Sequence, residues 1–182
     1  MHPTTTLIAC FGLALACPAQ SGNWVQMNPA TSPSARFDHA MAYDSKRGRT
    51  VMFGGTTNGY VHFADTWEWD GKNWALIKPA TSPSARSDHA MVYDAARGRT
   101  MMFGGYSPGA KELADTWEWD GKNWVELKPA TSPPARFVHA MVYDSARGRV
   151  VMFGGTKGKT VLGGTWEWDG KNWALIKSTT SP

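Results

Sequence analysis

Short apolar segments separated by turn residues recur along the whole chain. The first set lies at residues 39–43, 50–53, 66–69 and 73–77. Apolar and polar positions alternate in the first and third of these segments, as they do in strands that bury one face. Glycines such as Gly48 and the Asp70-Gly71 pair stand between the segments, where tight hairpins need them. No segment shows a sustained period of 3.6 residues, so the pattern predicts antiparallel strands and essentially no helix.

The set occurs three times with a period of 50 residues, and the final group of the third copy arrives one residue early. Each copy carries an arginine, a histidine three residues later, a glycine pair and three tryptophans, of which the last two belong to the set given next. These structural repeat residues are Arg36, His39, Gly54, Gly55, Trp69 and Trp74; Arg86, His89, Gly104, Gly105, Trp119 and Trp124; and Arg136, His139, Gly154, Gly155, Trp168 and Trp173. Such a period indicates one supersecondary unit whose apolar faces are buried by neighbouring copies.

The series Arg-x-x-His-Ala, the glycine pair, the aromatic-Asp pair Trp69-Asp70 and the tryptophan five residues later resemble the kelch repeat. The resemblance covers about residues 23–177, and the usual aromatic before the Asp is Tyr rather than Trp. Kelch repeats form the blades of β-propellers of the galactose oxidase/kelch superfamily. The resemblance therefore implies an all-β fold of three four-stranded antiparallel blades, each with the strand after the arginine innermost and its last Trp-bearing strand outermost.

The repeats divide the chain into expected parts. Residues 22–27 copy residues 72–77, so a spare outer strand is expected before the first blade. The parts are a signal peptide (1–19), the spare outer strand and linker (20–35), blade 1 (36–78), blade 2 (79–128), blade 3 (129–177) and a tail (178–182). Because propellers usually close with four to eight blades, three blades leave two faces uncovered. Two hypotheses follow: a homodimer that makes a six-bladed ring, or a partial propeller that is a fragment of a larger one or a degraded duplicate.

The first nineteen residues differ from the rest. An apolar run at residues 7–16 is too short to span a bilayer as a helix, and Cys17-Pro18-Ala19 offers a cleavage site. We therefore expect a secretory signal peptide cleaved near Ala19 and a secreted or extracytoplasmic protein without a transmembrane segment. A disordered or buried N-terminal strand is the alternative reading, and a lipid anchor on Cys10 or Cys17 is less favoured. Cleavage would remove both cysteines, and with them any disulfide, thiolate nucleophile or Cys ligand.

The net charge and the absence of known motifs argue against several classes of function. The net charge of +4 is spread through repeated turns without a basic cluster, so nucleic acid is not an expected partner. Galactose oxidase chemistry needs a copper site and a Cys-crosslinked Tyr, which a mature chain without Cys cannot supply. No phosphate loop, nucleophile elbow or HExxH pattern occurs. We expect no cofactor, no metal and no catalytic residue.

Two repeated polar groups each allow a chemical and a structural interpretation. The three histidines of the inner strands could converge on a metal, or each could satisfy its own blade. Glu68, Glu118 and Glu167 stand between tryptophans, as in sugar sites, or they pair with a repeated cation such as Arg36, Arg86 or Arg136. Catalytic groups normally occur once per site, so recurrence in every copy favours the structural interpretation of both sets.

The loop between the second and third strands varies most. Residues 29–78 and 79–128 differ at 15 positions, and seven of these lie within residues 56–63. A rigid framework with divergent loops is typical of a binding surface, although loops also drift when little constrains them. The candidate binding residues are Tyr60, His62, Phe63, Tyr106, Lys111, Lys157 and Lys159. We expect an exported, non-enzymatic scaffold that binds a protein or other macromolecule. The alternative is a cell-surface glycan-binding or glycan-processing propeller with Tyr60, Phe63 and Tyr106 as stacking groups.

Overall fold

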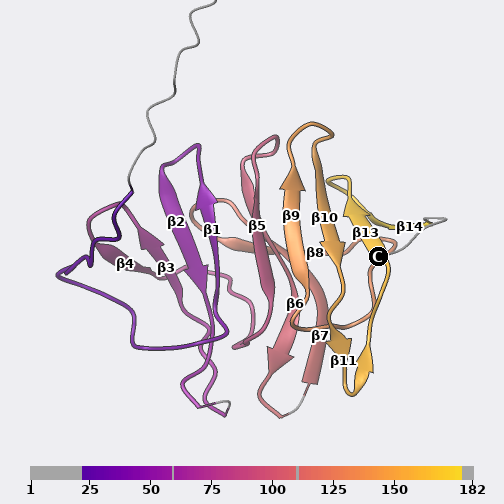
Figure 1. Ribbon diagram of the computed structural model, residues 1–182, viewed down its shortest axis with the longest axis horizontal. Coiled ribbons are helices and arrows are strands. Elements are labelled where there is room, and N and C mark those ends of the chain that lie inside the picture. The colour runs from indigo at the N-terminus through magenta and orange to yellow at the C-terminus, as the bar shows by residue number, and fades with distance from the viewer. Residues whose placement is uncertain (1–21, 59, 110, 178–182) are drawn as a thin grey trace, which may run out of the picture.

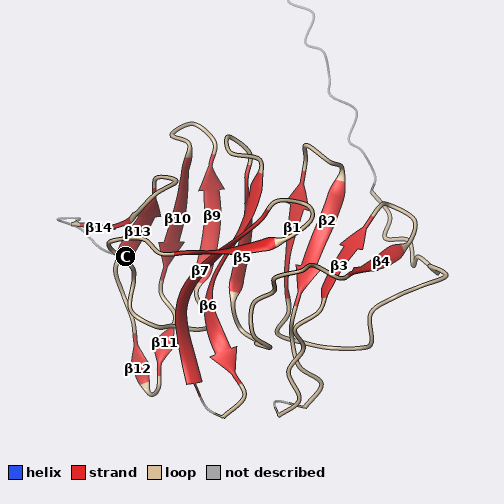
Figure 2. Ribbon diagram, turned by 180° about the vertical axis from the view of Figure 1, so that it is seen from behind, coloured by secondary structure: helices blue, strands red, loops and turns tan. Residues whose placement is uncertain are grey.

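The computed structural model describes residues 22–58, 60–109 and 111–177, and these residues form strands and loops without a helix (Figures 1 and 2). Three four-stranded antiparallel sheets follow one another in chain order. Blade 1 contains β1 (Ala40–Asp44), β2 (Arg49–Phe53), β3 (Thr66–Trp69) and β4 (Trp74–Ile77); blade 2 contains β5 (Ala90–Asp94), β6 (Arg99–Ser107), β7 (Lys111–Trp119) and β8 (Trp124–Leu127); blade 3 contains β9 (Ala140–Asp144), β10 (Arg149–Phe153), β13 (Thr165–Trp168) and β14 (Trp173–Ile176). The predicted all-β architecture of three four-stranded blades is confirmed.

The innermost strands of the three blades lie side by side in the middle of the molecule. β1 contacts β5, and β5 contacts β9, while β4 and β14 lie toward the two outer edges (Figure 1). Each inner strand begins one residue later than the sequence predicts, at an alanine rather than at the histidine. The residue before each histidine has a left-handed backbone, with φ of 54° at Asp38, 57° at Asp88 and 49° at Val138. This bend ends the extended conformation and sets the start of the strand.

Blade 2 packs one face on blade 1 and the other face on blade 3. Val51 and Phe53 of blade 1 meet Trp119 and Trp124 of blade 2 in one buried cluster. Equivalent residues of blades 2 and 3, including Phe103 and Trp173, form a second cluster. Period-2 alternation explains the division, because neighbouring residues of one strand point to opposite faces. The hydrophobic core therefore lies between the blades.

The expected spare outer strand is not formed. Residues 22–27 are described but belong to no strand, and the Trp24 side chain is fully exposed. Its counterpart Trp74 lies in β4, which pairs with β3. A strand needs such a neighbour for its backbone hydrogen bonds, and the described residues provide none beside residues 22–27. The prediction of an additional strand there was wrong.

The linker before each blade is fixed to the outer hairpin of that same blade. Ala30 N–H donates to Asn73 Oδ1 at 2.9 Å, and Trp74 N–H donates to the Thr31 carbonyl at 3.3 Å. The same pair of contacts recurs at the starts of blades 2 and 3. Each structural unit thus begins at its proline-rich linker.

Two expectations concern residues outside the described part of the chain. The signal peptide, its cleavage near Ala19 and both cysteines fall within residues 1–21, and the tail begins at residue 178. In the described ranges, no helix has the length and apolar character needed to cross a bilayer.

Candidate functional site

The repeated arginine before each inner strand is a structural residue. The Arg36 and Arg86 guanidinium groups each form a two-pronged ion pair with an aspartate of their own blade, Asp65 and Asp115. The Arg86 side chain is fully buried. Blade 3 lacks this carboxylate, because Gly164 stands at the corresponding position. The buried Arg136 keeps the two carbonyl contacts that all three arginines make, here with Gly154 and Pro134, and burial lowers its pKa.

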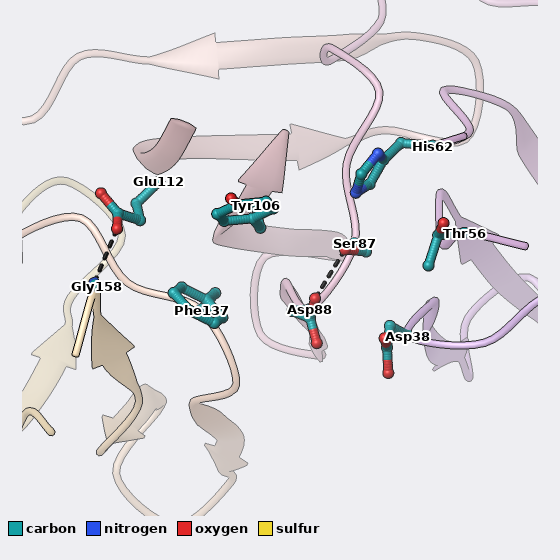
Figure 3. Close-up of a pocket in the computed structure, with 9 residues that line it drawn as sticks. All are labelled: Asp38, Thr56, His62, Ser87, Asp88, Tyr106, Glu112, Phe137 and Gly158. Carbon is teal, nitrogen blue, oxygen red and sulfur yellow. Dashed lines mark hydrogen bonds between the residues drawn. The ribbon is translucent and has the colours of Figure 1, made fainter. Parts of the chain in front are cut away.

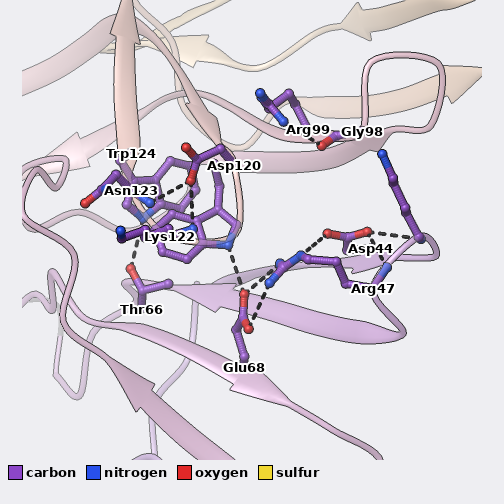
Figure 4. Close-up of polar contacts among 12 residues, drawn as sticks. Asp44, Arg47, Thr66, Glu68, Gly98, Arg99, Asp120, Lys122, Asn123 and Trp124 are labelled. Carbon is purple, nitrogen blue, oxygen red and sulfur yellow. Dashed lines mark hydrogen bonds and ion pairs between the residues drawn. The ribbon is translucent and has the colours of Figure 1, made fainter.

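The repeated glutamate pairs with a different arginine from the one expected. Glu68 accepts two hydrogen bonds from the Arg47 guanidinium, at 2.7 and 3.1 Å, and another from Trp119 Nε1 of blade 2 at 2.9 Å (Figure 4). Glu167 forms an ion pair with the equivalent arginine, Arg147, at 2.6 Å. The expected pairing with Arg36 and its equivalents was wrong, because those arginines lie at the other end of the blade. The structural interpretation of the glutamates holds with a different cation.

Glu118 is the exception among the three glutamates. It forms no ion pair with any described residue, and burial is the main cause that raises its pKa. Its expected donor, Trp168 Nε1 of blade 3, is buried and has no hydrogen-bond partner in the described structure. Arg97, the counterpart of Arg47, instead donates to Asp94 and to the Asp169 carbonyl. The two blade junctions therefore differ in polar contacts although their apolar contacts match.

Two of the repeated histidines, His89 and His139, pack between blades. His89 meets the Phe53 ring edge-on with centroids 5.7 Å apart, and His139 meets Phe103 at 5.6 Å. Burial, aided by Arg86, lowers the pKa of His89 to about 3, and burial lowers that of His139 to about 4. Both rings are neutral at physiological pH. No three His, Cys, Asp or Glu side chains of the described residues gather as a metal site would require.

Three loops between second and third strands meet at one end of the blades, which we call the loop face. In blade 2, β6 and β7 extend there as a long hairpin with a register shift between Phe103 and Gly105. In blade 3, the loop contains β11 (Thr156–Lys157) and β12 (Thr160–Val161). Isolated bridges pair Thr56, Tyr106 and Thr156 with the residues that precede the inner strands (Phe37, Ser87 and Phe137). These bridges fix the bases of the loops to the inner part of the blades.

A pocket of about 430 Å³ lies on the loop face and is contributed by all three blades. Its lining residues are Asp38, Thr56, His62, Ser87, Asp88, Tyr106, Glu112, Phe137 and Gly158 (Figure 3). The Tyr106 ring contacts Phe137 at 5.4 Å and His62 at 6.3 Å between centroids. The Gly158 N–H donates to Glu112 Oε1 at 2.8 Å and so joins the loops of blades 2 and 3. The pocket combines an aromatic wall with carboxylates.

The two aspartates of the pocket are held by the backbone. Asp88 N–H donates to the Asp38 carbonyl at 2.9 Å, and Ser87 Oγ donates to Asp88 Oδ2 at 2.7 Å. Partial burial and the nearby Asp88 carboxylate raise the pKa of Asp38. The left-handed backbone at both residues fixes their positions, and Asp is among the residues that tolerate it. The floor of the pocket is therefore acidic.

Comparison with known proteins assigns the fold family. The family model for the Attractin/LZTR1 beta-propeller matches residues 13–162, which is more than half of the chain. The chain belongs to this propeller family. A comparison with curated proteins finds no significant match. The kelch-type resemblance read from the sequence is confirmed, and the matched residues include the loop face of this propeller.

The structure places the predicted binding residues of the propeller in three different settings. His62 and Tyr106 line the pocket. Phe63 lies under the Arg36 guanidinium, 3.9 Å from its ring centroid, and so supports the blade. The other candidates are exposed on the loops without lining the pocket: Tyr60, Lys111, Lys157 and Lys159. The loop face thus brings only part of the predicted set together.

Several pocket residues were not predicted. Asp38 and Asp88 directly precede the histidines of the inner strands and lie outside the variable loops. Phe137 belongs to a segment outside the variable loops. A signal existed, because the residue before the aspartate position changes from Phe37 to Ser87 to Phe137 while its surroundings are repeated. A position that varies within an otherwise identical unit is one that the packing common to all blades does not fix.

Proposed function

We propose that this propeller is a non-catalytic scaffold that binds a protein segment at its loop face, with one basic side chain of the ligand in the pocket. The observation that carries the proposal is the adjacent pair Asp38 and Asp88 beside the aromatic wall of Tyr106 and Phe137 (Figure 3). The propeller family supports an interaction role. Glu68 and Glu167 pair with arginines of their own blades, and His89 and His139 pack between blades, so we assign no catalytic function to these residues.

The aspartate pair favours a cation. The proximity of Asp88 helps raise the pKa of Asp38, which means that the folded protein disfavours two negative charges there. No lysine or arginine of the described residues forms an ion pair with either carboxylate. A guanidinium or ammonium group would relieve this repulsion through charge-assisted hydrogen bonds. It would also gain cation–π attraction from Tyr106 and Phe137.

The rim of the loop face has the opposite charge. Lys111, Lys157 and Lys159 are exposed on the loops of blades 2 and 3. Their charges would repel a uniformly basic ligand and attract acidic residues. We therefore expect the bound segment to carry a basic residue flanked by acidic ones, since complementary charge gives specificity and a fast association rate. Export by the predicted signal peptide would place this partner outside the cytoplasm.

Selection from a displayed library of random short peptides against purified residues 20–182 tests the proposal. We expect Arg or Lys at one position and Asp or Glu around it. Asp88→Asn should weaken binding of a selected peptide about tenfold or more, since hydrogen bonds to charged groups contribute about 1.5–3 kcal/mol. Glu126→Gln is the matched control, because it removes a carboxylate from an exposed position of β8. Selected peptides without a basic residue, or equal binding by the Asp88→Asn variant, would refute the proposal. Binding of soluble polysaccharides in place of peptides would support the glycan alternative.

A further inference from the structure

The two terminal blades each expose a face that is buried everywhere else in the protein. On blade 1, Met41 is 51 % exposed and Tyr43 is 60 % exposed, whereas their counterparts Met91 and Tyr93 in blade 2 are 8 and 9 % exposed. We call this surface the leading face. On blade 3, Phe153 is 38 % exposed, while its counterparts in blades 1 and 2 are fully buried. We call that surface, with Val142 and Glu167, the trailing face.

The internal junctions show what each face binds. At both junctions a tryptophan Nε1 of the later blade donates to a threonine Oγ1 of the earlier blade, from Trp124 to Thr66 at 2.9 Å and from Trp173 to Thr116 at 3.1 Å. Both junctions also contain the edge-on pair of a phenylalanine with the next blade's histidine. The leading and trailing faces are therefore the two halves of one contact that the structure forms twice.

Backbone hydrogen bonds repeat across the same junctions. Asp88 N–H donates to the Asp38 carbonyl, and Val138 N–H donates to the Asp88 carbonyl at 3.0 Å. The N–H of Gly55 donates to the Arg86 carbonyl at 2.8 Å, and that of Gly105 to the Arg136 carbonyl at 2.9 Å. These bonds involve no side chain, so any blade of this sequence can make them with any other.

Each open face retains its half of this set. The leading face carries Trp74, His39 and the Asp38 N–H. The trailing face carries the matching partners: Thr165 for Trp74, Phe153 for His39, and the Val138 carbonyl for the Asp38 N–H. It also carries the Gly155 N–H, whose counterparts Gly55 and Gly105 donate to the next blade. Trp69 and Glu167 similarly match the pair Trp119 and Glu68. The surface that fits the leading face best is thus the trailing face of a second copy.

We infer that two copies of this chain join head to tail and close a six-bladed ring. A head-to-tail contact forms either a closed ring or an open filament. Propellers close with four to eight blades, and six is the only multiple of three in that range. Two copies use both open faces of each, so the ring leaves no blade face uncovered. In the closed ring, the partner's Asp38 lies beside Val138. The row formed by Asp38, Asp88 and Val138 then continues around the whole central axis of the propeller.

Sedimentation equilibrium and light scattering on residues 20–182 test the ring. The expected mass is twice that of one chain. Phe153→Arg on the trailing face and Tyr43→Arg on the leading face should each give a folded monomer by circular dichroism. Val161→Arg, on an 81 % exposed loop residue, is the matched control and should remain dimeric.

Mixing the two monomeric variants identifies the geometry. The mixture retains one junction with two unaltered faces, so it should recover a species of twice the monomer mass. A wild-type monomer, an open polymer, or a dimer broken by only one of the two arginine substitutions would overturn the ring. The wild-type mass decides the question even if one variant fails to fold.

Discussion

The two blade junctions allow a matched test of the glutamate contacts. Glu68→Gln removes the negative charge that accepts from Arg47 and Trp119 but keeps the shape of the side chain. Glu118→Gln makes the same chemical change at the next junction, where Glu118 forms no ion pair with a described residue and receives no hydrogen bond from Trp168 Nε1. The two substitutions should therefore change the free energy of unfolding by different amounts or in opposite directions.

The expected magnitude follows from burial and partners. The Glu68 side chain is 10 % exposed, and its three donors lie at 2.7 to 3.1 Å. Hydrogen bonds to a charged group contribute about 1.5–3 kcal/mol, so Glu68→Gln should lower the free energy of unfolding by about that amount at pH 7. Burial raises the pKa of Glu118, which means that ionisation costs stability as pH rises above its unfolded value. Glu118→Gln should leave stability unchanged or increase it.

Urea denaturation monitored by tryptophan fluorescence measures both changes in the free energy of unfolding. They are obtained from the shift of the denaturation midpoint when the slope m stays constant. Trp119→Phe and Trp168→Phe complete the comparison, because both make the same loss of ring volume but only Trp119 also loses an N–H that donates to a glutamate. Glu68→Gln and Trp119→Phe should be coupled by about 0.5–3 kcal/mol, while the other pair should be additive. Equal destabilisation by the two glutamine substitutions would refute the reasoning.

Three further predictions concern the blade framework. Gly105→Ala should destabilise the protein more than Gly48→Ala in thermal unfolding. Both residues have positive φ, but a Cβ on Gly105 would lie 2.7 Å from a carbonyl oxygen, whereas one on Gly48 meets open space. Equal losses of stability would contradict this prediction. Arg86→Met should cost about 3–5 kcal/mol in urea because it leaves a carboxylate unpaired, whereas Arg136→Met should cost clearly less because Arg136 has no ion pair; the reverse order would exclude the explanation. Because the pKa of His89 is about 3 in the folded protein, this histidine takes up its proton at higher pH in the unfolded state. The free energy of unfolding should therefore fall as pH drops from about 6.5 toward 3, by at most about 1.4 kcal/mol per pH unit for this group. A free energy of unfolding that stays constant across that range would refute the prediction.

Repetition made the blades predictable and the pocket difficult to predict. Alternation and paired glycines located the four strands of blade 1 to within a residue, since hairpin geometry is local, whereas β6 and β7 of blade 2 continue several residues into the loop. The partner of Glu68 was not local: Arg36 and Arg47 recur equally regularly, and only the folded sheet places Arg47 beside the glutamate. The pocket required the junctions themselves, because Asp38, Tyr106 and Phe137 come from three different blades. Residues 22–27 failed as a strand although their sequence copies residues 72–77, because a strand depends on its neighbour.

The linker contacts have a consequence for how such a chain originates. Ala30 and Asn73 lie 43 positions apart and are joined by a hydrogen bond, so the two ends of a unit lie together. A DNA segment that encodes such a unit can be copied in tandem, and each copy folds with its own linker already anchored. The 15 differences between residues 29–78 and 79–128 are then the substitutions that followed one duplication. Inserting another unit after Lys78 should lengthen the array by one blade, with two junctions in place of the one between blades 1 and 2.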